Sequence, residues 1–470
     1  MLAQPAQHRQ NRCGPTWNDG DNAEEINMAV TDELPFHLKG NYAPVTEEIT
    51  ASDLEVSGQI PAELEGRYLR NGANPITGES GHWFLGDGMI HGVRLTGGNA
   101  EWYRNRYVRT PFYDDPTASA TDPDSMFDIT NSKANTHVVG HGGRILCLEE
   151  GHVPWEISPE LDTIGPVDWG GKLSGSFTAH PKVCPRTGEM FAFGYNVMPP
   201  YLTYLRVSAD GAMTQMSEID IPAPVMMHDF NVTDRHIVFM DLPVVFDMDL
   251  AMKGTMPFTF QPSNGARLGV MPRDGDNATV RWFDVDPCYV FHPVNSYDDG
   301  NNIVLDVARY PEMFRQGGSF DTAATLWRWT IDTTTGTVTE TQLDDRNLEF
   351  GRVPDSLVAN DYRYGYAVGD SRVAGSPEAR TVVKYDLKSN SSDPFDLGGV
   401  HRQPGEFVFV DRDGATSEDD GWLMGYVYDQ AEDRSDLVIL NASDTNSAPV
   451  ATIKLPKRVP FGFHGSWIAD

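Results

Sequence analysis

Short runs of apolar or alternating residues, separated by turns rich in glycine, asparagine and aspartate, fill the sequence from about Glu48 onward. This two-residue period is typical of β-strands, and a short polar or glycine turn between two such runs predicts a β-hairpin. The clearest pairs are THVVGH and RILCLEE around Gly142-Gly143, MIHGVRL and AEWYRNRYVR, MFAFGY and YLTYLRV, TLWRWTID and TVTETQL, and GWLMGYVYD and SDLVILNA. Only short pieces, such as residues 247–253, have a helical pattern. The sequence therefore predicts an all-β propeller, barrel or sandwich, and no fixed-period repeat selects among the three.

The pattern also predicts how the chain is divided. Residues 1–35 are polar and aperiodic, so we expect an N-terminal tail or a strap over the surface. The strand pattern is uniform after them, and large β architectures often exceed ordinary domain length. We therefore expect one domain over residues 36–470.

Charge and cysteine content exclude several classes of protein. The chain has 68 acidic and 36 basic residues, a net charge of −32, which argues against nucleic-acid binding and against a polybasic membrane anchor. Its four cysteines form no C-x-x-C pair, and its N-terminus has no apolar signal core. No apolar stretch is long enough to span a bilayer. We expect a cytoplasmic protein.

Four histidines stand in short, distinctive frames: FTAHPK at His180, MMHDF at His228, YVFHPVNSY at His292 and GFHGSW at His464. Imidazole is the commonest protein ligand for a catalytic transition metal. Each of the first three precedes or enters a strand-like run, which suits a radial β-structure whose strand ends converge on an axis. The four frames together favour a metal site over four unrelated polar side chains.

Three glutamates occupy apolar, strand-like surroundings, where an unpaired carboxylate is costly. A ligating imidazole must donate its second ring nitrogen to an acceptor, and a carboxylate is favoured. Glutamates on the surface of edge strands would look similar in sequence. The three residues are Glu150 in CLEEG, Glu349 in LEFGRV and Glu406 in PGEFVFV.

These frames, together with RYLRNGANP (67–75) and HWFLGDGMIHGVRL (82–95), resemble the carotenoid cleavage oxygenase family over about residues 40–470. The resemblance implies a seven-bladed β-propeller with a dome of loops and short helices over the metal centre. It implies Fe(II) bound by His180, His228, His292 and His464, with Glu150, Glu349 and Glu406 orienting three of them. It also places the methyl group of Thr136, in the frame ANTHVV, near an open coordination position.

The activity that the resemblance implies is oxidative cleavage of a conjugated double bond by O₂, giving two carbonyl products. The expected substrate is an apolar conjugated molecule, a carotenoid or apocarotenoid, in an apolar tunnel with aromatic walls. Stilbene-cleaving members typically carry a lysine just before the first of these glutamates, together with a tyrosine. Here Glu149 stands in the lysine position, and Tyr107 in RNRYVRT is either the matching tyrosine or an ordinary strand aromatic; both are candidate substrate contacts.

Three alternatives remain open at this stage. The first is a stilbene or phenylpropanoid dioxygenase, and the second a non-oxidative carotenoid or retinoid isomerase or binding protein. The third, a propeller with structural zinc, is disfavoured because structural zinc prefers thiolates. The apolar, Met-rich segment 243–260 is predicted either to make weak peripheral contact with a membrane or to form a buried loop.

Overall fold

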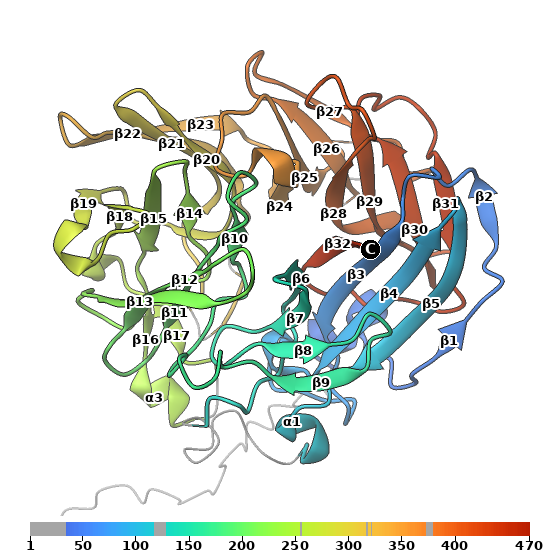
Figure 1. Cartoon of the computed structure of the whole chain (residues 1–470), viewed down its shortest axis with the longest axis horizontal. Coiled ribbons are helices and arrows are strands. Elements are labelled where there is room, and N and C mark those ends of the chain that lie inside the picture. The colour runs from blue at the N-terminus through green and yellow to red at the C-terminus, as the bar shows by residue number, and fades with distance from the viewer. Residues whose placement is uncertain (1–33, 117–127, 254–255, 316–317, 321, 373–378) are drawn as a thin grey trace, which may run out of the picture. The chain divides into compact units, whose positions relative to one another are not determined.

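Seven antiparallel sheets surround a common axis in the computed structural model, which describes residues 34–116, 128–253, 256–315, 318–320, 322–372 and 379–470 (Figure 1). Residues 36–470 form one compact unit. This is the predicted seven-bladed β-propeller. The tail or strap predicted for residues 1–35 falls almost entirely outside the described residues.

Four sheets are each built from four strands that follow one another in the chain, because each strand turns back on its predecessor through a short loop. Their strands are β6 (His137–His141), β7 (Arg144–Leu148), β8 (Trp155–Ile157) and β9 (Thr163–Pro166); β10 (Lys182–Val183), β11 (Met190–Tyr195), β12 (Leu202–Val207) and β13 (Met213–Ile219); β20 (Tyr289–Asp299), β21 (Asn302–Tyr310), β22 (Thr325–Asp332) and β23 (Thr337–Asp344); and β24 (Leu348–Arg352), β25 (Tyr364–Asp370), β26 (Arg380–Asp386) and β27 (Ser391–Pro394).

A fifth sheet contains an inserted hairpin. Its strands are β14 (Asn231–Val232), β15 (His236–Asp241), β18 (Arg267–Pro272) and β19 (Arg281–Asp284), and the inserted hairpin pairs β16 (Val244–Phe246) with β17 (Phe258–Phe260). The hairpin and the short helix α3 (Met248–Ala251) account for most of segment 243–260. Val244 is buried there, whereas Met252 is 82% exposed, so the segment is only partly buried.

The last two sheets close the ring by joining distant parts of the chain. One combines β1 (Thr50–Ala51), β3 (Gly66–Ala73), β4 (Gly88–Thr96) and β5 (Asn99–Tyr107) with the far strand β32 (Gly465–Ala469). The other adds the early strand β2 (Val56–Gly58) to β28 (Arg402–Asp411), β29 (Gly421–Asp429), β30 (Arg434–Asn441) and β31 (Ala451–Lys454). These two pairings, β2 with β31 and β32 with β3, link the beginning of the described chain to its end.

The predicted hairpins are confirmed, and their turns have the expected chemistry. In the first, His141 pairs with Arg144 across Gly142 and Gly143, whose φ angles are +56° and +76°. Left-handed backbone at both central positions is the geometry that favours glycine. A short helical turn, α3, also forms within the predicted stretch 247–253.

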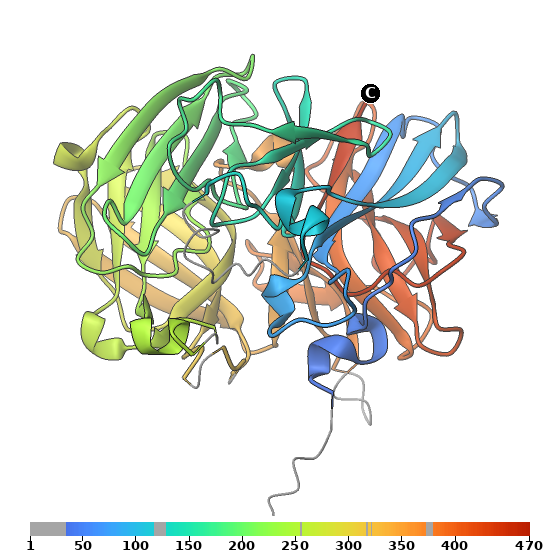
Figure 2. The ribbon, with the colours of Figure 1, turned by 90° about the horizontal axis from the view of Figure 1, so that it is seen from below.

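Helices are few and short in the described residues, and none there is long and apolar enough to cross a membrane. Figure 2 shows the blue turns near residues 36–42 and the yellow-green turns near residues 248–264 on one side of the sheets. Besides α3 they are η1 (Phe36–Leu38), η2 (Gly40–Tyr42), η3 (Trp83–Leu85), α1 (Pro111–Asp114), η4 (Pro262–Asn264), η5 (Asn277–Thr279) and η6 (Asp355–Leu357).

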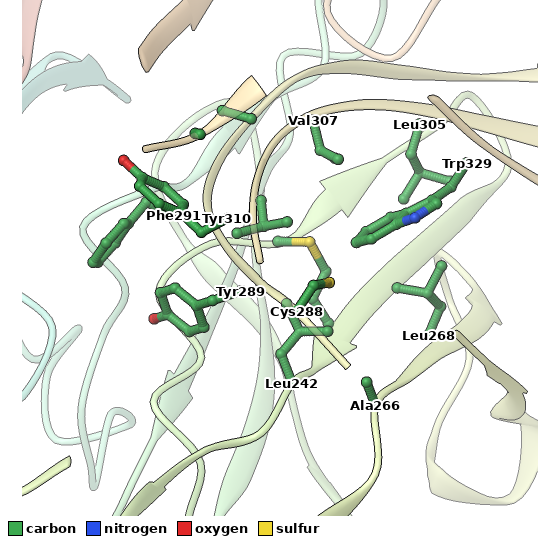
Figure 3. Close-up of a cluster of buried hydrophobic side chains, with 14 of the residues drawn as sticks. Leu242, Ala266, Leu268, Cys288, Tyr289, Phe291, Leu305, Val307, Tyr310 and Trp329 are labelled. Carbon is green, nitrogen blue, oxygen red and sulfur yellow. The ribbon is translucent and has the colours of Figure 1, made fainter. Parts of the chain in front are cut away.

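Apolar side chains fill the spaces between neighbouring blades. Figure 3 shows one such cluster, in which Leu242 and Leu268 lie beside Leu305, Val307 and Trp329 of the next sheet. The same cluster continues through Tyr289 and Phe291. Because burial of apolar area is the main stabilising contribution to folding, these inter-blade layers fix the spacing of the sheets and hence of their innermost strands.

Replacing Leu305 with alanine should lower the free energy of unfolding by about 2–5 kcal/mol, because it opens a cavity in this layer. Urea denaturation monitored by tryptophan fluorescence measures the change. Ile164→Ala is the control, since that side chain is 62% exposed on β9 and should change stability by less than about 0.5 kcal/mol. Equal effects from the two substitutions would contradict the assignment of this layer as core.

Candidate metal centre

The innermost strands of four blades bring the four predicted histidines together. His180 and His228 lie just before β10 and β14, His464 directly precedes β32, and His292 lies within β20. These strands surround the middle of the ring (Figure 1), and histidines at or near their beginnings come together there. These four residues are called the histidine cluster below.

The histidine cluster is compact and largely buried. One ring nitrogen from each residue lies within 4.8 Å of the others. The ring centroids of His180 and His228 are 4.4 Å apart, and those of His292 and His464 are 4.6 Å apart. The Nε2 atoms of His228 and His292 approach to 3.1 Å.

Three members of the cluster direct their other ring nitrogen, Nδ1, at a glutamate. The Nδ1–Oε distances are 2.5 Å for His228 and Glu150, 2.6 Å for His292 and Glu349, and 3.0 Å for His464 and Glu406. Glu150 follows β7, whereas Glu349 and Glu406 lie on the inner strands β24 and β28. A carboxylate facing Nδ1 keeps the proton on that atom, which leaves Nε2 unprotonated.

The fourth histidine has a different neighbour. His180 Nδ1 lies 3.7 Å from Asp229, whose carboxylate is bound by Lys182 Nζ at 2.8 Å. His180 Nε2 is buried and has no hydrogen-bond partner in the protein. A buried ring nitrogen without a partner is costly, so this atom is suited to a ligand from outside the chain.

One close contact in the cluster needs a positive centre between its two nitrogens. The Nε2 atoms of His228 and His292 lie 3.1 Å apart, a distance that a shared proton or a bound cation stabilises. Two nitrogens bound at right angles to one ion, each at about 2.1 Å, would lie about 3 Å apart. A shared proton bridges only two of the four ring nitrogens, whereas one metal ion can bind all four. The residues present therefore fit a transition-metal ion.

The electrostatic surroundings keep two of these imidazoles neutral. Burial, followed by the neighbouring histidines, holds the pKa of His180 well below its usual value. Burial also lowers the pKa of His464 to about 3, although Glu406 acts in the opposite direction. Neutral imidazole is the form that binds a metal.

A model of the family described as retinal pigment epithelial membrane protein matches residues 42–469. The chain belongs to the carotenoid cleavage oxygenase family. It is 40% identical to a carotenoid cleavage oxygenase of Mycobacterium tuberculosis, covering 94% of this chain and 98% of the relative. It is 34% identical to the carotenoid 9,10(9',10')-cleavage dioxygenase 1 of Arabidopsis thaliana, covering 93% and 90%. The family resemblance predicted from the sequence is thus confirmed.

Solved structures agree with this assignment. A lignostilbene dioxygenase of Pseudomonas brassicacearum superposes with a TM-score of 0.83 at 29% identity, covering 93% of this chain and all of that one. A variant of the Synechocystis apocarotenoid oxygenase superposes with a TM-score of 0.82 at 28% identity, covering 92% and 98%. The two likenesses do not by themselves choose between the two substrate classes.

Thr136, the threonine expected beside the metal, is hydrogen-bonded to the backbone of His464 in the histidine cluster. Its carbonyl oxygen accepts a hydrogen bond from the His464 backbone N–H at 3.0 Å. Its hydroxyl donates to Asn135 Oδ1 at 2.9 Å. Thr136 is therefore held at the start of β6, next to His464, and its role toward the metal stays a prediction.

Sequence reasoning missed two side chains that hold the glutamates in place. The Tyr195 hydroxyl donates to Glu150 Oε2 at 2.6 Å, and Arg352 donates to both Glu406 oxygens at 3.0 and 3.2 Å. Tyr195 ends the predicted strand MFAFGY, and Arg352 lies three residues after Glu349. Nothing in a single strand pattern marks either residue as part of the centre.

The two candidate substrate contacts, Glu149 and Tyr107, are engaged inside the protein. Glu149 lies 2.9 Å from His152 Nδ1 and accepts hydrogen bonds from the backbone N–H of Lys133 at 3.1 Å and of Gly151 at 2.5 Å. The Tyr107 hydroxyl accepts a hydrogen bond from Asn74 Nδ2 at 2.6 Å. A substrate contact would have to displace these partners, so both roles stay predictions.

The histidine cluster lies between a group of aromatic side chains and a cavity. On one side Phe291 packs edge-on against His228, with ring centroids 4.9 Å apart, and contacts Phe84 and Phe320. Along the inner strands, a cavity of about 910 Å³ reaches His180, His292 and His464. Its lining mixes charged side chains, such as Lys182, Asp229, Arg352 and Glu406, with apolar ones, such as Val294, Phe350 and Ile468, so it lacks the continuous apolar wall expected of the substrate tunnel.

The buried Glu149–His152 pair predicts a pH-dependent contribution to stability. Burial acts to raise the pKa of Glu149 and to lower that of His152, but their mutual attraction prevails, so the pKa of Glu149 is lowered and that of His152 raised. The His152 contribution is complete below its unfolded pKa of about 6.5 and is lost as pH rises through the raised folded value. The Glu149 contribution is present above about 4.5 and is lost on acidification.

Glu149→Gln should therefore lower the free energy of unfolding by about 1–3 kcal/mol near pH 5.5 and by less near pH 9. Urea denaturation at the two pH values measures the difference. Glu101→Gln is the control, because the Glu101 carboxylate is exposed and 3.5 Å from Arg94. A loss that is independent of pH would show that the pair is not charged in the folded protein.

Proposed function

We propose that this protein is an Fe(II)-dependent dioxygenase that cleaves a conjugated carbon–carbon double bond of a carotenoid or apocarotenoid. The observation that carries the proposal is the convergence of four imidazoles, each with one ring nitrogen within 4.8 Å of the others, inside a fold shared with carotenoid-cleaving relatives. Both atoms of O₂ enter the products, one on each carbon of the broken bond. The two resulting carbonyls balance the reaction without an external reductant.

The donor set suits iron(II). Four neutral histidines leave the charge of a divalent ion uncompensated within its own ligands, and imidazole binds iron, cobalt and zinc alike. A cobalt-substituted form of the Synechocystis apocarotenoid oxygenase, with a TM-score of 0.80 to this chain, is consistent with a divalent-metal site of this kind. Bound Fe(II) would supply the electron density that activates dioxygen.

The protein's own residues then position the reactants. His180, His228, His292 and His464 hold the metal. Glu349 and Glu406 fix the His292 and His464 rings through hydrogen bonds with Nδ1, and Glu150 lies 2.5 Å from His228 Nδ1. Thr136 limits access beside His464. Phe291 and the aromatic residues around it offer an apolar surface along which a polyene lies, so that one double bond is presented and water is excluded.

A carotenoid or apocarotenoid is favoured over a stilbene on two observations. The curated relatives cited above act on carotenoids by name. A stilbene-type lysine is absent from position 149, and the nearby Lys133 is bound to Asp87 at 2.7 Å. The stilbene alternative keeps support from the likeness to the lignostilbene dioxygenase.

Weak contact with a membrane is proposed for the hairpin region around α3. Met248 and Met252 are 59% and 82% exposed there. Exposed apolar side chains insert into the interface of neutral lipid, whereas the net charge of −32 repels anionic lipid. Flotation with neutral vesicles but not with anionic ones would support this contact, and loss of flotation in a Met248→Ser, Met252→Ser variant would assign it to α3.

His228→Ala should lose metal and activity together, because it removes one of the four converging nitrogens. Metal content by mass spectrometry after Fe(II) reconstitution and dialysis is expected to fall at least about 100-fold, beyond the effect typical of residues behind the ligands. His141→Ala is the matched control, since that histidine lies on β6 and contacts the Gly188 carbonyl oxygen at 2.9 Å. An iron-loaded, active His228→Ala protein would contradict the ligand assignment.

Incubation of the iron-loaded protein with β-carotene, a β-apocarotenal and resveratrol under ¹⁸O₂ should give labelled carbonyl products from one of the first two. Immediate borohydride reduction prevents exchange of the carbonyl oxygen with water, and mass spectrometry then locates the label. Products from resveratrol alone would assign the protein to stilbene cleavage. Unlabelled isomers, or bound but unchanged substrate, would favour the isomerase or binding alternative.

A further inference from the structure

A four-residue piece of the inner strand β24, Glu349–Arg352, touches two members of the histidine cluster. Glu349 lies 2.6 Å from His292 Nδ1. The Phe350 ring stacks on His292 at 5.5 Å between centroids and meets His464 edge-on at 5.4 Å. One short segment therefore lies against two histidines that come from different blades.

Arg352 extends this contact through a closed set of hydrogen bonds. Its guanidinium donates to Glu406 Oε1 at 3.0 Å and Oε2 at 3.2 Å, and to the Gly465 carbonyl oxygen at 2.6 Å. The Gly465 backbone N–H in turn donates to Glu406 Oε2 at 2.8 Å, and His464 Nδ1 lies 3.0 Å from Oε1. Arg352 is thus hydrogen-bonded both to Glu406, which contacts the His464 ring, and to Gly465, which follows His464 in the chain.

A β-bulge makes this arrangement possible. Residues three apart in a regular strand face opposite sides of a sheet. Between the pairs Glu349–Val368 and Arg352–Tyr366, β24 advances three residues while β25 advances two. Phe350 has a φ of +57°, a left-handed conformation that is uncommon for an aromatic residue. The extra residue of the bulge places the Glu349 and Arg352 side chains on the same side of the sheet, so both point toward the histidine cluster.

The bulge also sits close to the strand that carries His292. A Cβ atom on Gly351 would lie 2.6 Å from Val294 Cγ2, so only glycine permits this approach. Backbone strain at a defined position persists where the surrounding structure fixes it, and such positions cluster at functional sites. The strained backbone at Phe350 sets the directions of the Glu349 side chain, which contacts His292, and of the Arg352 side chain, which acts on His464 through Glu406.

We propose that Arg352 is a positioning residue for the metal: delivered by the bulge at Phe350, it locks Glu406 and the backbone after His464, and so fixes the His464 ring for coordination. This inference rests on the metal site of the proposed function. It assigns no contact between Arg352 and substrate or metal. The planar guanidinium is suited to the role, because it donates to a carboxylate at two points and still reaches a carbonyl.

The test compares Co(II) binding by the full-length apoprotein with binding by three variants, using the visible absorption of Co(II) as the readout. Arg352→Met removes all the hydrogen bonds of the guanidinium. Arg352→Lys keeps the positive charge but not the two parallel hydrogen bonds to Glu406. Arg328→Met is the matched control: Arg328 is 25% exposed against 23% for Arg352, and it grips the buried Asp306 at 2.7 and 2.8 Å away from the cluster. Thermal unfolding of each variant is measured in parallel.

We expect Arg352→Met to bind Co(II) roughly 10–100-fold more weakly, the range found when partners of ligand residues are removed, with a changed absorption band. Arg328→Met should lose stability yet bind as the wild type does. Wild-type affinity in Arg352→Met, or an equal loss in Arg328→Met, would overturn the proposal. If Arg352→Met does not fold, Arg352→Lys decides, since wild-type affinity in that variant would refute a role for the two parallel hydrogen bonds. A wild-type protein that binds neither Co(II) nor Fe(II) would instead refute the metal site itself.

Discussion

The 3.1 Å approach of the His228 and His292 Nε2 atoms is the constraint on which the centre depends. Glu150 and Glu349 lie 2.5 and 2.6 Å from the opposite ring nitrogens, Nδ1, and so orient both rings. Glu406 faces Arg352 and Asp229 faces Lys182, so those two pairs are each neutral overall. Glu150 and Glu349 are bonded instead to a tyrosine hydroxyl and a backbone N–H. Each carboxylate beside the cluster is therefore held by a partner of its own.

The propeller supplies the rigidity that this arrangement needs. The four histidines, Glu349 and Glu406 lie on or next to the innermost strands, and Glu150 follows the second strand of its blade; apolar layers between the blades fix the positions of these strands. A shift of one blade would separate a histidine from its glutamate, since such pairs come from different sheets: His228 precedes β14, while Glu150 follows β7. Packing far from the axis therefore governs the geometry of the histidine cluster.

Much of this architecture could be predicted from the sequence. The strand period and glycine turns predicted individual hairpins, such as that at Gly142-Gly143, because these signals are local. The number of blades came from the family frames, since the strands of this chain have no fixed repeat. Ring closure by β2 and β32 joins residues some 400 positions apart, which a local pattern does not encode.

In the candidate site, too, some residues could be predicted from the sequence and others could not. His180, His228, His292 and His464 stand out by residue type and frame, and the structure brings them together. Arg352 escaped notice because strand alternation places it opposite Glu349, and only the bulge at Phe350 reverses that. Lys182 and Tyr195 read as ordinary strand residues. Their contacts depend on how neighbouring blades pack, which periodicity does not reveal.

The position of His464 beside the closing strand has a consequence for biosynthesis. His180, His228 and His292 leave the ribosome well before β32, and β32 pairs with β3, which was made near the beginning. The ring and the histidine cluster are therefore completed in the same late event. A nascent chain lacks the fourth histidine of the cluster until its blades have closed, so the complete site proposed for the metal exists only in the finished fold.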